Sequence, residues 1–165
     1  MKVKLKNIDY SLINYNEVNS STLNDGTLVN ISYLDNELEF QSCKTIINSI
    51  NNNYFELKLL PTEASRTFYN KLIQLENEYN KYLLTKNINK QIKSIFKNEY
   101  FTVKIPFKNN HPLVKVYDKD NKLINFYKLI NNNTIICLFV CKNLWITKDS
   151  DIHYQLTVKE ILLLE

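Results

Sequence analysis

The stretch Phe101-Thr102-Val103-Lys104-Ile105-Pro106-Phe107-Lys108 decides the fold class, because its apolar residues recur at every second position. Successive side chains of a strand point to opposite faces of a sheet, so a period of two is typical of a strand with one buried face. We expect the four apolar side chains to lie in the core, and Lys104 and Lys108 to share the opposite face. The chain after residue 98 is therefore predicted to be mainly β.

The same pattern continues toward the C-terminus. Further strands are predicted at residues 113–117, 123–127, 134–146 and 153–163. Asp118-Lys119-Asp120-Asn121 predicts a hairpin turn between the first two. In the first of them, Lys115 and Tyr117 share one face, which is polar and aromatic. Residues 134–146 are apolar on both faces, which is typical of a central strand.

Toward the N-terminus, two short alternating runs predict a β-hairpin. Residues 28–33 and 37–41 flank the polar pair Asp35-Asn36. The turn signal Asn24-Asp25-Gly26 precedes them. Gly26 is the one glycine of the chain, and glycine enters positive φ most freely. We therefore expect Gly26 to serve a turn.

A helix is predicted between the two β regions. It follows a strand at residues 54–60 and begins at Pro61-Thr62-Glu63, after which apolar side chains recur at spacings of three and four. Its predicted buried face comprises Phe68, Leu72, Leu75, Tyr79 and Tyr82. A second, weaker helix is predicted at residues 88–96.

This order of elements predicts an α+β, mainly β fold. A curled antiparallel sheet or small barrel with an inserted helix or helical pair fits it, and the oligonucleotide-binding (OB) barrel is one of the few such architectures of this size. Residues 1–24 are interpreted as an N-terminal arm with at most a short strand. Residues 25–165 are interpreted as a single OB-like nucleic-acid-binding domain.

The composition of the 165-residue chain is that of a globular protein, with 44% hydrophobic and 23% charged residues. No apolar run reaches the roughly 20 residues that span a bilayer, and the basic N-terminus lacks the apolar region of a secretory signal. Three cysteines, an odd number, favour reduced thiols. A cytoplasmic protein without membrane contact is expected.

The residue types that carry catalysis or bind metals occur without the necessary partners. A chain with one glycine has no glycine-rich phosphate loop, and neither of its two histidines has an evident Ser or Cys partner. Cys137 and Cys141 are separated by roughly 13 Å along the predicted strand. Asp118 and Asp120 fit a hairpin turn better than a metal site. The sequence predicts no enzyme, no metal and no cofactor.

The charge is concentrated between Lys86 and Lys148. This segment holds twelve lysines and only three acids, a balance of +9, whereas the whole chain carries +4. The bias toward Lys, Asn, Ile and Tyr is also what an A/T-rich genome produces, but such a bias does not explain why the lysines gather in one segment. Lysines interleaved with aromatic rings are typical of proteins that bind single-stranded nucleic acid.

The candidate nucleic-acid-binding residues follow from this pattern. Those predicted to neutralise phosphates are Lys104, Lys108, Lys115, Lys119, Lys122, Lys128 and Lys148. Those predicted to stack on bases are Tyr33, Tyr117, Phe126, Tyr127 and Trp145. Trp145 is exposed only if its strand contains a bulge. The chain has a single arginine, Arg66, so the predicted binding tracks phosphates and has weak sequence preference.

The chain resembles the single-stranded DNA-binding proteins of large cytoplasmic DNA viruses and of yeast cytoplasmic linear plasmids. The matching segments are Asp25-Gly26 with the run ending Leu38-Glu39-Phe40-Gln41, the helix around Phe68-Tyr69-Asn70-Lys71-Leu72, and the block from Phe101-Thr102-Val103-Lys104-Ile105-Pro106 through Val116-Tyr117-Asp118 to Leu144-Trp145-Ile146. The resemblance implies an OB-like fold, non-specific binding of single-stranded DNA and a role in cytoplasmic replication beside other replication proteins. It also implies that Tyr154 takes the place of a stacking ring.

Two alternatives come from other classes of protein. The first is an RNA-binding protein of viral or plasmid transcription, because no motif in the chain separates DNA from RNA. The second is a structural or assembly protein that forms a homo-oligomer through aromatic contacts and the apolar end Ile161-Leu162-Leu163-Leu164.

Overall fold

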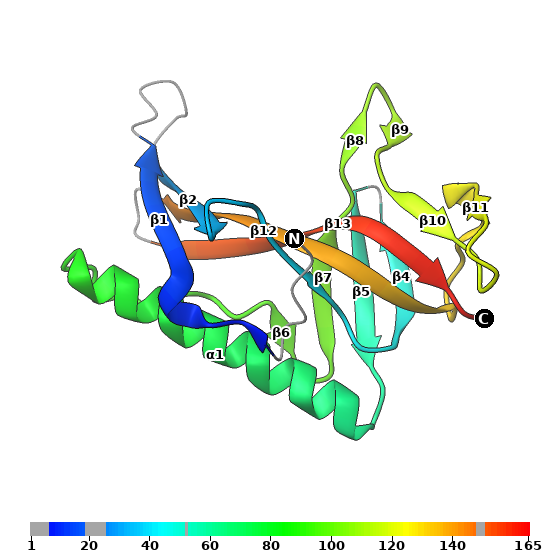
Figure 1. The fold of residues 1–165 in the computed structure, drawn as a ribbon, viewed down its shortest axis with the longest axis horizontal. Coiled ribbons are helices and arrows are strands. Elements are labelled where there is room, and N and C mark those ends of the chain that lie inside the picture. Colours follow the sequence, from blue (N-terminus) through cyan, green and yellow to red (C-terminus); the bar gives the residue numbers. More distant parts are fainter. Residues whose placement is uncertain (1–6, 19–25, 52, 148–150) are drawn as a thin grey trace.

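The computed structural model describes residues 7–18, 26–51, 53–147 and 151–165, and it places one long helix beneath a strongly curled sheet (Figure 1). The helix is α1, Glu63–Thr85. The strands are β1 Ile13–Val18, β2 Gly26–Tyr33, β3 Leu38–Gln41, β4 Thr45–Asn51, β5 Tyr54–Leu59, β6 Phe96–Lys97, β7 Tyr100–Lys104, β8 Phe107–Lys108, β9 His111–Pro112, β10 Lys115–Tyr117, β11 Leu123–Ile124, β12 Thr134–Thr147 and β13 Ile152–Leu163. Short 3-10 turns span Tyr10–Leu12 and Phe126–Lys128.

The central strand is β12, as the two-sided apolar run predicts. It pairs antiparallel with β13 over most of its length, and its other neighbours in succession are β4, β3 and β2. β13 also runs parallel to β10 and meets β7 in a parallel bridge, so the sheet is mixed and curls back on itself. The predicted α+β, mainly β, OB-like fold is confirmed. The prediction of a purely antiparallel sheet is corrected by these parallel contacts.

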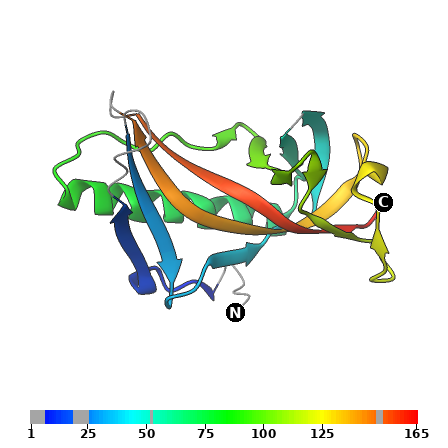
Figure 2. The same ribbon diagram turned by 90° about the horizontal axis from the view of Figure 1, so that it is seen from above.

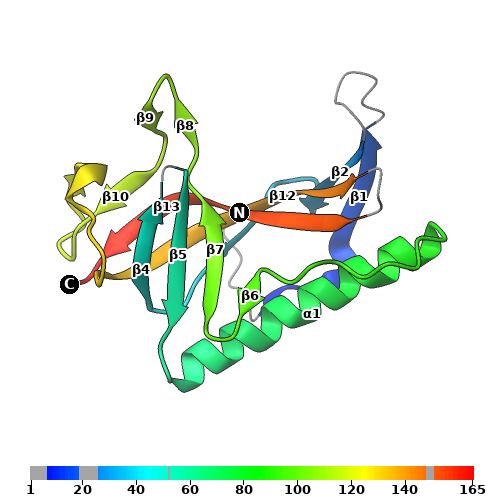
Figure 3. The ribbon, with the colours of Figure 1, turned by 180° about the vertical axis from the view of Figure 1, so that it is seen from behind.

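Helix α1 covers the underside of the β12–β13 ribbon (Figure 2). It begins where predicted, because the Thr62 hydroxyl accepts a hydrogen bond from the Ser65 amide and so satisfies an amide that the first turn leaves free. Phe68, Leu72, Leu75 and Tyr79 are buried, as the spacing predicts, whereas Tyr82 is only half-buried. Seen from behind, β4, β5 and β7 form the wall that stands on the N-terminal end of the helix (Figure 3).

The second predicted helix is wrong. Residues 88–95 run extended along α1, and their backbone amides bond to partners outside the segment. The Ile92 amide donates to the side chain of Asn80, the Lys93 amide to the carbonyl of Ile152, and the Ile95 amide to the carboxyl group of Glu76. These tertiary hydrogen bonds replace the ones that a helix would form within the segment.

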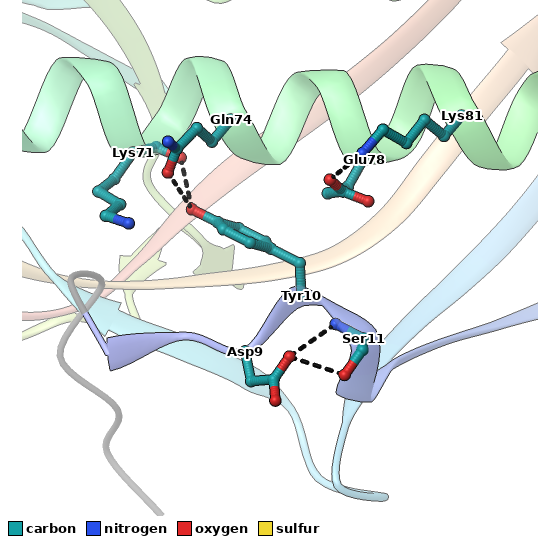
Figure 4. A network of polar contacts seen from close by, with 7 residues as sticks. All are labelled: Asp9, Tyr10, Ser11, Lys71, Gln74, Glu78 and Lys81. Carbon is teal, nitrogen blue, oxygen red and sulfur yellow. Dashed lines mark hydrogen bonds and ion pairs between the residues drawn. The ribbon is translucent and has the colours of Figure 1, made fainter.

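The described part of the predicted N-terminal arm packs on the rest of the molecule. Strand β1 pairs with β2 along its whole length. Just before it, the Tyr10 hydroxyl donates to the carbonyl of Lys71 at 3.1 Å, and the Lys71 ammonium lies 5.9 Å from the Tyr10 ring centroid (Figure 4). Asp9 caps this turn by accepting from the amide and hydroxyl of Ser11. The segment is therefore tied both to the sheet and to α1.

The predicted hairpin at residues 28–41 is wrong as a pairing. Strands β2 and β3 form where expected, but both pair with β12, one after the other. The chain leaves β12 over residues 31–37: residues 31–33 continue β2 beside β1, and residues 34–37 form a detour closed by reciprocal backbone hydrogen bonds of Tyr33 and Asn36. Asp35 and Asn36 do lie in a turn, as predicted. The strand that pairs with β2 and β3 lies about a hundred residues away in the sequence, so a local sequence pattern does not indicate it.

Asparagine, rather than glycine, takes the left-handed backbone positions. Positive φ occurs at Asn87, Asn98, Asn109, Asn110, Asn121 and Asn132, as well as at Leu34 and Asp35. Asparagine tolerates this conformation better than other residues with a Cβ. Gly26 begins β2 without a positive φ, so the prediction that it serves a turn is corrected, while Asn24 and Asp25 lie outside the described residues.

Candidate nucleic-acid interface

A groove runs over the outer face of the sheet, on the side away from α1. It has a volume of about 690 Å³ and is lined by Leu28, Lys104, Pro106, Lys142, Asn143, Trp145, His153, Tyr154, Gln155 and Thr157. These residues come from β2, β12, β13 and the β7–β8 segment. In Figure 1, β12 and β13 cross the space between the β1–β2 pair and the β8–β9 hairpin, which both rise above the sheet.

Trp145 occupies the middle strand of this face. In register, it lies between Leu28 of β2 and His153 of β13. The pairing of β12 with β13 slips between Cys141 and Leu144, and after this bulge Leu144 is fully buried while Trp145 is half-exposed. The condition for exposure of the indole, a bulge in the strand, is thus met.

Gly26 explains how the indole lies on the sheet. A Cβ at this position would come within 3.2 Å of Trp145 Cζ2 and within 2.6 Å of the Ile146 carbonyl oxygen. Glycine is needed here for the close approach of the ring to the backbone, and not for a turn conformation. The Trp145 ring is thereby supported from the side of β2.

Two lysines contribute charge to the groove. Lys104 is half-buried on β7, beside Thr157 of β13, and no carboxylate in the described ranges lies within ion-pair distance of it. Lys142 is exposed, and its ammonium group lies 2.5 Å from Glu37 Oε1. This hydrogen bond is the main reason why the pKa of the Glu37 carboxyl is lowered from its ordinary value.

An exposed tyrosine extends the groove along β5. Tyr54 is the register partner of Lys104, and its hydroxyl oxygen accepts a weak hydrogen bond from Gln155 at 3.5 Å. Its ring is 39% exposed, so a second aromatic surface lies next to the lysine that has no acidic partner. Rings of this kind beside a cation suit a base and its phosphate.

The β8–β9 hairpin continues from the groove residue Pro106. It carries the exposed Lys108, which has no acidic partner among the described residues. Tyr127, 65% exposed, lies against it, since its hydroxyl donates to the carbonyl of Asn110 at 3.4 Å. Lys128 follows and is also exposed. Of the predicted residues, the structure therefore brings together Lys104 and Trp145, with Lys108, Tyr127 and Lys128 adjoining.

Four other predicted residues lie elsewhere, on the β10–β11 hairpin. They are Lys115, Tyr117, Lys119 and Lys122. β10 pairs with β13 from Glu160 onward, about 23 Å along that strand from His153. The Asp118 carboxylate accepts from the amides of Asp120 and Lys122, as a turn residue should. Tyr117 instead lines a separate depression of about 340 Å³ with Gln41, Asn121 and Glu160.

Burial corrects three of the proposed stacking rings. Tyr33 is buried at the end of β2. Phe126 lies in a 3-10 turn rather than a strand, and its ring stacks on Phe55 in the core, with centroids 5.8 Å apart. Tyr154 is buried against α1, where its hydroxyl donates to Glu76 at 2.6 Å. None of these rings offers a face to a base. Lys148 lies outside the described residues.

Sequence reasoning missed Lys142, His153, Gln155 and Tyr54 as members of the groove. Strand alternation could have paired His153 with Gln155, but only the register with β12 and β5 brings them beside Trp145. Within the described residues, no three metal-ligating side chains gather in one place. In the same part of the chain, no helix has the length and apolar character needed to cross a bilayer.

Comparisons with known proteins identify the fold and not the family. No family model matches the chain, and no curated protein matches it. Among solved structures, the fold is similar to that of gp2.5, a single-stranded DNA-binding protein encoded by bacteriophage T7, with a TM-score of 0.62. The superposition covers 78% of this chain and 87% of gp2.5 at 11% sequence identity. Identity this low supports a shared architecture only.

Proposed function

We propose that the protein binds single-stranded DNA, without catalysis and with weak sequence preference, and coats exposed strands during DNA replication in the cytoplasm. The observation that carries this proposal is the joint position of Trp145 and Lys104 in one groove of an OB-like sheet. A base stacks on the indole, and Lys104 neutralises the neighbouring phosphate. The resemblance of the fold to a phage single-stranded DNA-binding protein supports the same function.

The path of the strand follows the charged and aromatic residues. It enters over β2 and β12 at Trp145, passes Lys104 and Tyr54, and leaves along Lys108 toward Tyr127 and Lys128. Lysine binds phosphate as a mobile point charge and does not read base edges. The groove contains no arginine, which fits binding without sequence readout.

Trp145 provides the first test, because it is the only tryptophan of the chain and lies in the proposed site. Titration with oligo-dT should quench its fluorescence as a base stacks on the ring. Unchanged emission in a solution where anisotropy shows binding would mean that DNA binds elsewhere. Matched RNA as competitor separates the RNA-binding alternative: stronger displacement by RNA than by DNA would assign the site to RNA.

Lys104→Gln tests the phosphate contact. Affinity for single strands should fall, and the log–log slope of affinity against salt should become shallower by about 0.7, the change for one lost phosphate contact. Lys97→Gln on β6 is the matched control, since it removes the same charge from an exposed site at the other end of β7. Equal losses of affinity in the two variants would mean that Lys104 acts only through the net charge of the protein and not through a phosphate contact in the groove.

The assembly alternative predicts a different result. The apolar C-terminal end, on which this alternative depends, packs largely within the sheet of the same molecule. Ile161 is buried, and Leu163 pairs with Ile135 of β12. An oligomer that persists in high salt, together with no binding of oligonucleotides in low salt, would favour the assembly protein over the proposed function.

A further inference from the structure

Lys142 of β12 lies at a break in the strand pairing, where β12 changes its partner from β3 to β2 and its register with β13 slips. Its neighbour Asn143 pairs with Asn30 of β2, and its other neighbour Cys141 pairs with Leu38 of β3. Residues 31–37 therefore separate the partners of Asn143 and Cys141, and the first three of them pair with β1 instead of β12. On the other side, the register with β13 slips at the same place. Such bulges commonly re-aim one side chain next to a functional site.

The detour places the carboxylate of Glu37 beside Lys142. Reciprocal hydrogen bonds between Tyr33 and Asn36 close the turn, and the Asn36 side chain donates to the carbonyl of Leu34 at 2.8 Å. Glu37 follows directly, with Oε1 2.5 Å from Lys142 Nζ and Oε2 3.4 Å from Lys159 Nζ. One carboxylate thus lies between two ammonium groups, the first of which lines the groove.

Lys159 does not depend on Glu37. It also makes a close ion pair with Glu39, which is largely buried and is the first cause of the raised pKa of Lys159. The four side chains form a row of ion pairs in the order Lys142, Glu37, Lys159 and Glu39. A change of partner by Glu37 would therefore leave each carboxylate with a lysine.

We propose that Glu37 occupies Lys142 in the free protein and releases it to a phosphate when a strand enters the groove, turning to Lys159 instead. This inference rests on the proposed function. A phosphate of the strand and the Glu37 carboxylate compete for the Lys142 ammonium group. The wild-type protein therefore breaks one exposed ion pair for each strand that it binds. Glu37 is then an internal competitor that sets the affinity of the groove.

The test compares four variants by the affinity for oligo-dT over a series of salt concentrations. They are Glu37→Gln, Lys142→Gln, the double variant, and Glu78→Gln as control. Glu78 pairs with Lys81 on α1, on the other side of the sheet, and its substitution changes the net charge equally. Glu37→Gln should bind about two- to fivefold more tightly than wild type, the range of an exposed ion pair. Its salt slope should stay unchanged, because Lys142 meets a phosphate in both proteins.

The gain must depend on Lys142. The double variant should bind no more tightly than Lys142→Gln, and Glu78→Gln should show at most a small gain. A gain that survives in the double variant, or an equal gain in Glu78→Gln, would reduce Glu37 to a general charge effect and overturn the inference. A salt slope steeper by about 0.7 in Glu37→Gln would also overturn it, since Glu37 would then stay on Lys142 in the wild-type complex.

The two proposals fail in different ways. Absence of oligonucleotide binding by the wild-type protein at low salt ends the proposed function and the inference together. Binding that quenches Trp145, combined with equal affinities of wild type and Glu37→Gln, ends the inference alone.

Discussion

The Trp145 ring lies close against the start of β2, where residue 26 has no side chain. We predict that Gly26→Ala lowers the free energy of unfolding by about 1–3 kcal/mol, the usual effect of overpacking, since the new Cβ would meet the Ile146 carbonyl oxygen at 2.6 Å. The Trp145 emission should shift and affinity for single strands should fall. Thermal unfolding and fluorescence measure these effects.

Thr27→Ala is the control for that substitution. Thr27 is the exposed neighbour of Gly26 on β2, and its change should alter stability by less than about 0.5 kcal/mol. If Gly26→Ala leaves emission and stability like those of Thr27→Ala, the ring does not rest on the backbone of β2 as the structure places it.

The sequence predicts the direction of some side chains of the sheet and not of others. Alternation alone assigned Val103 to the core and Lys104 to the outer face, and both assignments hold. The exposure predicted for Trp145 requires a bulge, which only the register with β13 reveals. The prediction that Phe126 stacks on a base is wrong, because a 3-10 turn replaces the expected strand and the ring lies in the core.

Among the elements, the extended segment at residues 88–95 is held in part by Glu76, a buried residue of α1. The carboxyl group of Glu76 accepts from the Tyr154 hydroxyl at 2.6 Å, from the Ser94 hydroxyl at 3.0 Å and from the Ile95 amide at 3.3 Å. Glu76→Ala should lower the free energy of unfolding by about 3 kcal/mol, because it leaves the buried Tyr154 hydroxyl and two part-buried donors without their acceptor. Chemical denaturation measures the loss.

The same helix supplies a control for Glu76→Ala. Glu78→Ala removes only the exposed pair with Lys81, three residues along the helix, and should cost less than about 0.5 kcal/mol. Equal losses in the two variants would mean that Glu76 does not hold the extended segment in place. Proteolysis within residues 88–95 should accelerate only in Glu76→Ala.

Strand partners were harder to predict than strands. The period of two located β7 and β10, and the apolar run located β12, because side-chain alternation is a local property. The partners of β2 and β3 lie on a strand more than ninety residues away, and local patterns do not encode such pairing. This is also why the groove residues Lys142 and His153 were not grouped with Trp145 in advance.

For the whole molecule, the three thiols report on the integrity of the core. Cys137 and Cys141 are fully buried on β12, and burial raises the pKa of Cys141 to about 12 and that of Cys137 further. Cys43 is half-buried, and burial raises its pKa as well. Thiolates, not thiols, react with disulfide reagents. The native protein should therefore label slowly, at Cys43 first.

Cys137 and Cys141 should react only at the rate of global unfolding, since β12 lies at the centre of the sheet. In denaturant all three thiols should react at once. Rapid labelling of Cys137 or Cys141 under native conditions would show that the centre of the sheet opens locally. A single-strand ligand should slow the labelling further, because it binds only the folded form.

The detour between β2 and β3 lies outside the pairing of the sheet. Residues 34–37 are exposed, and β12 keeps its backbone pairing on either side of them. On the proposal that Glu37 competes for Lys142, exchange of these four residues for another short turn should change the affinity for single strands while the sheet stays intact. Affinity and fold would then be set by separate parts of the molecule.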